Sequence, residues 1–181
     1  MAESVEQGGA DLPAEYTITW LEMTERPRTP VPPAPGGIRL ALIAAQAPPS
    51  HWFLYLYRTV GEAYYWDDWV RASEDERRQF LDDPEVSLHT LLIEGAPGGF
   101  FMLDTRQPGT CDLAYFGLMP EAVGRGLGYW FLMSAVDAGW QRRGVERMTV
   151  NTCTLDHPRA LGNYQRAGFT PARRETRPLK G

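Results

Sequence analysis

The sequence is short of the residue types on which several classes of protein depend. Its 181 residues include two cysteines, three histidines and a single lysine, Lys180. Cys111 and Cys153 form no CxxC pair, so a disulfide framework and a cysteine metal site both lack their residues. The three histidines are scattered along the chain, which argues against a histidine metal centre. We therefore expect no metal and a reducing compartment.

Long apolar runs and basic clusters are also missing. No stretch approaches the length of a membrane span, and the first residues, Met1–Gln7, are acidic and polar where a signal peptide is basic and then apolar. The formal net charge is −5 and no run of arginines occurs, which argues against a nucleic-acid binder. These absences predict a cytoplasmic protein that binds neither membrane nor nucleic acid.

The overall composition is that of a globular protein. Hydrophobic residues make up 43% of the chain and charged residues 23%, which is too apolar for a disordered chain. Residues 1–14 are small, polar and acidic, so we expect them to be loosely ordered. The remaining residues, 15–181, suit one domain of ordinary size.

Hydrophobic periodicity predicts an α/β fold. Alternating or short apolar runs predict strands at 16–23, 38–44, 86–94, 98–104, 111–119, 146–153 and from 169 onward. Helical spacing predicts two or three helices within 48–84, where Ser73 and Glu76 form a capping box, and further helices at 126–142 and 157–167. Asp156 is the predicted cap at the start of the last helix, and Gly168 is predicted to end it. The first two strands would form an edge hairpin, the next three an antiparallel meander, and the rest a strand, helix, strand crossover. The result is a mixed, mostly antiparallel sheet flanked by helices.

A glycine-rich turn at 119–128 leads into the helix that follows the meander. Gly124, Gly126 and Gly128 alternate with Arg125 and Leu127, and apolar residues then recur at helical spacing. The first amides of a helix have no partner within the helix, and glycines let a ligand come close to the backbone. The turn therefore favours the binding of an anion such as phosphate, although a glycine-rich helix start can also be only a tight turn.

Two common phosphate loops do not fit this turn. A Walker loop ends in Gly-Lys-Ser/Thr, whereas Gly128 is followed by Tyr129 and Trp130. A dinucleotide fingerprint needs another glycine and stands near the start of a βαβ unit, with an acidic residue about twenty residues further on.

Two motifs in this order resemble those of the GNAT superfamily of N-acyltransferases. The glycine turn, Val123-Gly-Arg-Gly-Leu-Gly128, is similar to the family's acyl-CoA loop, Arg/Gln-x-x-Gly-x-Gly/Ala, with Val123 at the first position. About forty residues later, the family carries Asn-x-x-Ala-x-x-x-Tyr-x-x-x-Gly-Phe. This chain matches it at Ala160, Tyr164, Gly168 and Phe169, and His157 stands where the family often has Asn.

The resemblance, which covers about 86–169, implies a GNAT-like fold, acetyl-CoA as the cofactor and a set of sites. It places the backbone amide near Leu118 at the thioester carbonyl. The residues it assigns to the cofactor are Leu118, Met119, Val123, Gly124, Arg125, Gly126, Leu127, Gly128, Tyr129 and His157.

Two catalytic residues follow from the resemblance. Tyr164 matches the tyrosine that protonates the departing thiolate in many family members, and a phenol suits that task because its pKa lies close to that of a thiol. Tyr164 can also be a tyrosine that only packs its helix. Asp112 stands where some relatives carry a catalytic glutamate and is the predicted base, with Asp67, Asp68 and Tyr115 as alternatives.

Aromatic residues are concentrated between Trp52 and Trp69, where most of them are expected to pack in the core. The segment from Tyr64 to Trp69 also carries carboxylates, a combination that suits a protonated amine. The residues predicted to bind the acceptor are Tyr65, Trp66, Asp68 and Tyr115.

The predicted activity is acetyl transfer from acetyl-CoA to the primary amine of a small molecule, such as an amine or an amino acid. A protein or peptide N-acetyltransferase is the nearest alternative, and a non-catalytic acyl-CoA-binding module is another. Because many relatives pair as dimers, the resemblance also allows a homodimer.

Overall fold

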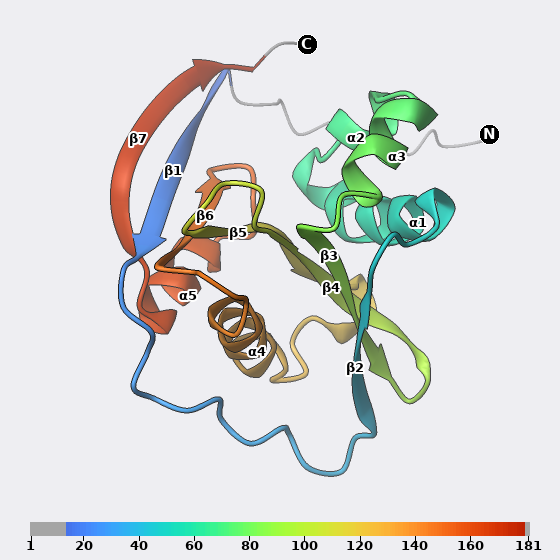
Figure 1. Cartoon of the computed structure of the whole chain (residues 1–181), viewed down its shortest axis with the longest axis vertical. Helices are drawn as coiled ribbons and strands as arrows, with labels where there is room; N and C mark the ends of the chain where they lie inside the picture. Colours follow the sequence, from blue (N-terminus) through green and yellow to red (C-terminus); the bar gives the residue numbers. More distant parts are fainter. Residues whose placement is uncertain (1–13, 180–181) are drawn as a thin grey trace, which may run out of the picture.

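Seven strands form one sheet in this computed structural model, which describes residues 14–179 (Figure 1). The strands are β1 (Glu15–Met23), β2 (Leu40–Ala45), β3 (Val86–Ile93), β4 (Ala96–Asp104), β5 (Thr110–Leu118), β6 (Arg147–Cys153) and β7 (Thr170–Pro178). Their order across the sheet is β2-β3-β4-β5-β6-β1-β7. Only β5 and β6 pair in parallel, and all other neighbours are antiparallel. The predicted mixed, mostly antiparallel sheet is confirmed.

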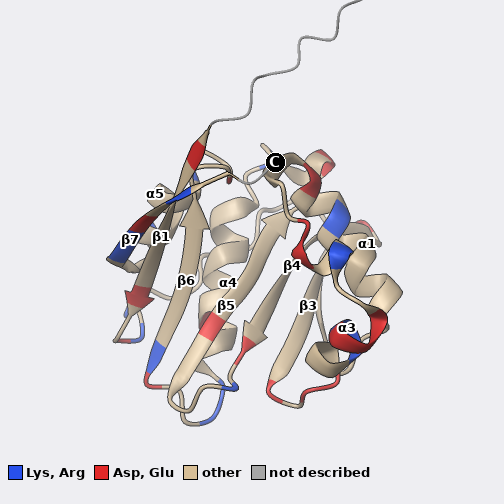
Figure 2. Ribbon diagram, turned by 90° about the horizontal axis from the view of Figure 1, so that it is seen from above, with Lys and Arg blue, Asp and Glu red and all other residues tan. Residues whose placement is uncertain are grey.

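Helices cover both faces of this sheet. The α-helices of the described residues are α1 (Ser50–Gly61), α2 (Asp68–Arg71), α3 (Glu74–Leu81), α4 (Gly128–Trp140) and α5 (Ala160–Ala167), with 3-10 turns at Glu62–Tyr64 and Pro120–Ala122. Figure 1 shows α1, α2 and α3 on one side of the sheet and α4 and α5 on the other. Charged residues gather on the helices, the loops and β7, whereas the strands in the middle of the sheet carry few (Figure 2).

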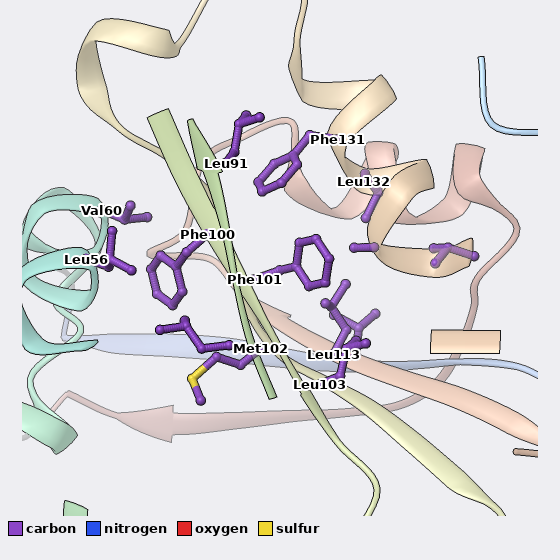
Figure 3. Close-up of a cluster of buried hydrophobic side chains, with 14 of the residues drawn as sticks. Leu56, Val60, Leu91, Phe100, Phe101, Met102, Leu103, Leu113, Phe131 and Leu132 are labelled. Carbon is purple, nitrogen blue, oxygen red and sulfur yellow. The ribbon is translucent and has the colours of Figure 1, made fainter. Parts of the chain in front are cut away.

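The middle of β4 is buried on both faces because each face packs on a helix. Phe100 and Met102 lie on the side of α1, while Phe101 faces Phe131 of α4, with 5.4 Å between the ring centroids (Figure 3). These three strand residues are fully buried. Successive side chains of a strand point to opposite faces, so one apolar run supplies two core layers.

The predicted hairpin between the first two strands is wrong. β1 lies between β6 and β7, while β2 pairs with β3 at the opposite edge of the sheet. The proline-rich segment 24–39 connects them as a long extended crossing, which Figure 1 shows running below the sheet. A hairpin joins its two strands by a short turn, whereas here a long proline-rich segment separates them, so long-range pairing decided where each strand lies.

Several local predictions are confirmed. β3, β4 and β5 form the antiparallel meander, and β5, α4 and β6 form the crossover. Ser73 caps α3 in a capping box with Glu76. Gly168 ends α5 in the left-handed conformation, with a φ of 110°.

Two helix starts differ from the prediction. α4 begins at Gly128 instead of Gly126, because Gly126 has a φ of 76° and so cannot continue a right-handed helix. α5 begins at Ala160 with Arg159 in the capping position. Asp156, the predicted cap, instead closes the turn after β6, where it accepts hydrogen bonds from the hydroxyl of Thr152 and the amide of Cys153, both at 2.8 Å.

The remaining predictions concern the N-terminal segment, the number of domains, the oligomeric state and the location of the protein. Residues 1–14 are predicted to be loosely ordered, and of these, 1–13 lie outside the residues that the structure describes. A single domain over 15–181 stays a prediction, as do the homodimer and the cytoplasmic location. None of the helices between residues 14 and 179 has the length and apolar character needed to span a membrane.

Candidate active site

The two parallel strands in the middle of the sheet separate after a short paired stretch. β5 and β6 pair from Thr110 and Arg147 only as far as Asp112 and Thr149. Immediately beyond, the pairing of β5 with β4 shifts, so that Ala114 is an extra residue in a β-bulge. A bulge bends its strand and increases the local twist. The two strands therefore diverge and leave a gap in the sheet.

A cavity of about 1270 Å³ occupies this gap. Its walls come from the separated strands, from the glycine turn before α4, from α5 and from the segment between α1 and α2. The lining residues from the separated strands are Leu113, Ala114, Tyr115, Phe116, Gly117, Leu118, Asn151 and Cys153. A volume of this size exceeds the roughly 300–1,000 Å³ of ordinary ligand pockets, which leaves room for two reactants.

The glycine turn forms one end of the cavity. Gly124 and Gly126 have φ angles of 82° and 76°, whereas Arg125 and Leu127 lie on the negative side of φ, and this alternation points successive amides into one concavity. Within residues 14–179, none of the amides of 124–127 donates to another backbone group. A Cβ atom on Gly124 or Gly126 would meet no atom within 4 Å, so the backbone is open to a ligand. This geometry is compatible with the predicted cradle for an anion, whose role in binding stays a prediction.

Not every residue assigned to the cofactor reaches this cavity with its side chain. Val123, Gly124, Gly126, Gly128 and Tyr129 line it. The side chains of Met119 and Leu127 are buried in the core, and that of Arg125 is exposed outside the cavity.

Hydrogen bonding also limits what two of these residues offer. The amide of Met119 donates to the carbonyl of Gly98 at 2.9 Å, and the amide of Val123 donates to that of Pro120 at 3.3 Å. The amide of Met119 is thus engaged in the sheet, whereas the amides of 124–127 have no backbone acceptor within residues 14–179.

Arginines of α5 provide cations near the cradle, and the sequence analysis missed them. Arg159, Asn163 and Arg166 all line the cavity. The guanidinium carbon of Arg166 lies 3.9 Å from the ring centroid of Tyr129, in the first turn of α4. Their spacing of four and then three residues, which puts side chains on one helix face, is the signal that could have identified them.

Leu118 lies at the gap, and its amide points into it. Met119 donates its amide to β4, on one side of β5. Because successive amides of a strand point to opposite sides, the N–H of Leu118 faces the side from which β6 has diverged. This geometry is compatible with the predicted contact between Leu118 and a thioester oxygen.

Tyr164 reaches the same gap from α5. Its ring packs at steep angles against Phe116 and Phe169, with centroids 6.4 and 6.0 Å away, and the residue is 7% exposed. Its hydroxyl makes no hydrogen bond within the described residues. Burial, with smaller effects from the charges of Asp156 and Asp112, raises the pKa of Tyr164 well above its usual range. The phenol therefore stays protonated.

The four residues predicted to bind the acceptor, Tyr65, Trp66, Asp68 and Tyr115, all line the cavity. The ring centroid of Tyr115 lies 5.5 Å from that of Trp66, and its hydroxyl accepts a hydrogen bond of 2.7 Å from the indole of Trp69. Burial raises the pKa of Tyr115 to about 12, and the charge of Asp68 adds to this effect. The structure brings these residues together, and their role in binding stays a prediction.

Asp112 lies outside this cavity. It lines a smaller one with Asp104, Arg106 and Thr149, at the end of the sheet where β5 and β6 are still paired. The hydroxyl of Thr149 donates to its carboxyl at 2.6 Å, and burial raises the pKa of that carboxyl. Asp112 and Tyr164 therefore line different cavities, and the role of Asp112 as the base stays a prediction.

His157 and Asp156 line the cavity next to aromatic residues. The Nδ1 atom of His157 accepts a hydrogen bond of 3.1 Å from the amide of Arg159, which fixes the ring at the entrance to α5. Asp156 accepts a bond of 3.3 Å from the indole of Trp66 in addition to those from the end of β6. This aspartate therefore ties the aromatic wall to β6.

A family model matches this chain. The model of the acetyltransferase (GNAT) family matches residues 47–169, which include α1, the separated strands, the cradle and α5. The chain therefore belongs to the GNAT family, whose members use acetyl-CoA. No curated protein matches the sequence.

Three solved structures share the fold at low sequence identity. A GCN5-related N-acetyltransferase from Kribbella flavida is 16% identical, with a TM-score of 0.57 over 86% of this chain and 54% of its own. An aminoglycoside acetyltransferase from an uncultured soil metagenomic sample, in complex with trehalose, is 13% identical, with a TM-score of 0.57 over 71% of this chain and 87% of its own. An aminoglycoside N-acetyltransferase in complex with CoA is 14% identical, with a TM-score of 0.52 over 82% of this chain and 96% of its own. This chain thus spans about half the length of the Kribbella protein.

Proposed function

We propose that this chain transfers an acetyl group from acetyl-CoA to the primary amine of a small molecule, by direct attack of the amine. The observation that carries the proposal is the single cavity in the gap between β5 and β6. One end has unpaired amides and arginines, and another has aromatic rings and carboxylates. Such a cavity suits an anionic donor and a cationic acceptor that meet within the sheet.

The donor end fits coenzyme A. The amides of 124–128 and the guanidinium of Arg166 suit its phosphates, because unpaired helix-start amides and arginines both bind phosphate oxygens. The gap between the strands would take the extended arm that leads to the thioester. Bound acetyl-CoA would supply the acyl group that the amine attacks.

Two groups of this chain would then assist the transfer. The N–H of Leu118 would donate to the thioester oxygen as negative charge develops on it, a contact that favours the transition state. The buried hydroxyl of Tyr164, which stays protonated, would give its proton to the departing sulfur. The acceptor must first lose a proton, and the carboxylates of the large cavity are better placed for this than Asp112, directly or through a water.

The acceptor end supports a small molecule. Tyr65, Trp66 and Tyr115 form its aromatic wall beside Asp67 and Asp68. Two of the solved structures that share the fold are those of aminoglycoside acetyltransferases.

The test is release of free CoA thiol from acetyl-CoA in the presence of three acceptor sets: small amines, amino acids, and peptides with free N-termini. Turnover with small amines or amino acids supports the proposal. Turnover with peptides alone would overturn it in favour of a protein N-acetyltransferase. Tight binding of CoA without turnover of any acceptor would overturn it in favour of a binding module.

A further inference from the structure

The three aspartates that line the cavity differ in whether their carboxylates already have an ion-pair or hydrogen-bond partner. Asp67 forms an ion pair with Arg71, and Asp156 accepts hydrogen bonds from Trp66, Thr152 and Cys153. Asp68, the third aspartate of the cavity lining, is exposed and has no ion pair or side-chain hydrogen bond within residues 14–179. One carboxylate is therefore available to a ligand.

Two arginines of the cavity lining also already have partners. Arg71 pairs with Asp67, and Arg177 pairs with Glu175 at 2.7 Å. A carboxylate on the acceptor would have to compete with Asp67 for Arg71, and would be repelled by Asp68 itself. A second or third ammonium on the acceptor would find no unpaired carboxylate there.

The remaining surface of this end is aromatic. The centroids of Tyr57, Trp66 and Tyr115 lie between 5.2 and 5.6 Å from one another. Tyr65 stands beside them, 56% exposed, with a φ of 58° that is unusual for a bulky residue. Strained backbone of this kind persists where the surroundings hold it and is concentrated at ligand sites. Such a wall is apolar and aromatic, which suits an aromatic group on the acceptor.

We propose that the acceptor is a primary amine with a single positive charge and an aromatic body. Its ammonium pairs with Asp68, and its ring packs against Tyr65, Trp66 and Tyr115. This inference rests on the proposed function and narrows its acceptor to an arylalkylamine, as distinct from an amino acid or a polycationic sugar.

The transfer balances without a further reactant. The ammonium loses one proton to reach the neutral amine, which forms the new bond from nitrogen to the acyl carbon. The bond from carbon to sulfur breaks, its electron pair leaves with sulfur, and the sulfur takes a proton from Tyr164. The nitrogen then loses its second proton to solvent and Tyr164 regains one, so one proton is released for each amide formed.

Four acceptors test the predicted contacts with the ammonium and with the ring one at a time. 2-Phenylethylamine has one ammonium and a ring, phenylalanine adds a carboxylate, hexylamine lacks the ring, and an aminoglycoside carries several ammonium groups. We expect kcat/KM to be highest for 2-phenylethylamine, and lower by about 10-fold or more for phenylalanine, because its carboxylate has to compete with Asp67 for Arg71. An aminoglycoside or phenylalanine that exceeds 2-phenylethylamine would overturn this inference and leave the proposed function standing. Absence of turnover with all four and with every other amine and amino acid would overturn the proposed function.

Variants of the wall test the two contacts. Asp68→Asn should lower kcat/KM for 2-phenylethylamine by about 10- to 100-fold, mainly through KM, because a hydrogen bond between charged groups is lost. Asp68→Glu keeps the charge and should restore part of the loss, and Asp75→Asn removes the same charge from exposed α3 and should change nothing. Unaltered kinetics in Asp68→Asn would refute the ion pair.

Tyr65→Asn tests the ring contact without adding strain, since Asn tolerates a positive φ. It should raise KM for 2-phenylethylamine by about 2- to 10-fold and leave KM for hexylamine unchanged. An equal change for both amines would refute the stacking contact. Thermal unfolding of each variant shows whether it is folded.

Discussion

Substitution of Gly126 by alanine, with Gly144→Ala as the control, tests whether the glycine turn binds CoA. Both changes add the same backbone strain, so a loss of binding in only one of them cannot come from strain. Gly126 has a φ of 76°, and Gly144, in the turn after α4, has a φ of 77°. A Cβ atom would meet nothing within 4 Å at either position. The two glycines therefore impose the same conformational demand, but only Gly126 lines the cavity.

Both substitutions should cost a similar amount of stability. A left-handed conformation costs a residue other than glycine about 1–2 kcal/mol. For a chain of this length, that corresponds to a fall in Tm of about 2–8 °C. Thermal unfolding without ligand measures the loss, and we expect Gly126→Ala and Gly144→Ala to agree within experimental error.

The two variants should differ in their affinity for CoA. In Gly126→Ala, a methyl group stands on the cavity wall, or the backbone relaxes toward negative φ and turns an amide away from the phosphate. Loss of one hydrogen bond to a charged group costs about 1.5–3 kcal/mol, which weakens binding by about 10- to 150-fold. Isothermal titration calorimetry with CoA should show this for Gly126→Ala only. If Gly126→Ala binds CoA as tightly as the unmodified chain, the phosphates do not lie on this turn.

The remaining predictions concern three single side chains. Tyr164→Phe should bind CoA normally and lower kcat by about 10-fold or more, as expected for an acid group, and an unchanged kcat would remove Tyr164 from the chemistry. Asp112→Asn should change kcat less than about 10-fold at every pH, since Asp112 lies in another cavity, and a larger loss concentrated at low pH would restore it as the base. Because burial raises the folded-state pKa of Asp112 above 3.8, this carboxyl lowers the free energy of unfolding as the pH rises through that range. Urea titrations should show a smaller decline in Asp112→Asn, and an identical decline would contradict the burial effect. Ser73→Ala removes the cap of α3 and should cost about 1 kcal/mol in thermal unfolding, whereas an unchanged Tm would show that the capping box contributes nothing.

Features that depend on neighbours in the chain could be predicted from the sequence. The capping box of Ser73 and Glu76 joins groups three residues apart, and Gly168 ends α5 because its own φ is positive. The alternation in β4 likewise follows from residues next to one another, as Phe100 and Phe101 point to opposite faces. Such patterns are local, so their physical causes are present in a short stretch.

The positions of the acidic residues could not be predicted from local sequence. Asp112 was assigned from its position on a strand before the glycine turn, yet β5 is still paired with β6 at that point, and the gap opens only beyond it. Asp156 was assigned as a helix cap, yet its carboxyl closes the turn after β6 and holds Trp66, ninety residues away. Which acid faces the cavity depends on where two strands separate, and no local pattern encodes that.

By itself, the sequence determined the strands and helices, the open glycine turn and the family to which the chain belongs, because these rest on local spacing and backbone conformation. Only the tertiary structure decided that β1 lies beside β7, that Arg159 and Arg166 line the cavity, and that Asp68 is the aspartate of its lining left without a partner within residues 14–179. Each of these depends on contacts between segments far apart in the chain, where strand pairing and competition for hydrogen-bond partners select one arrangement. The cavity between β5 and β6 exists because their pairing ends early, at Asp112 and Thr149.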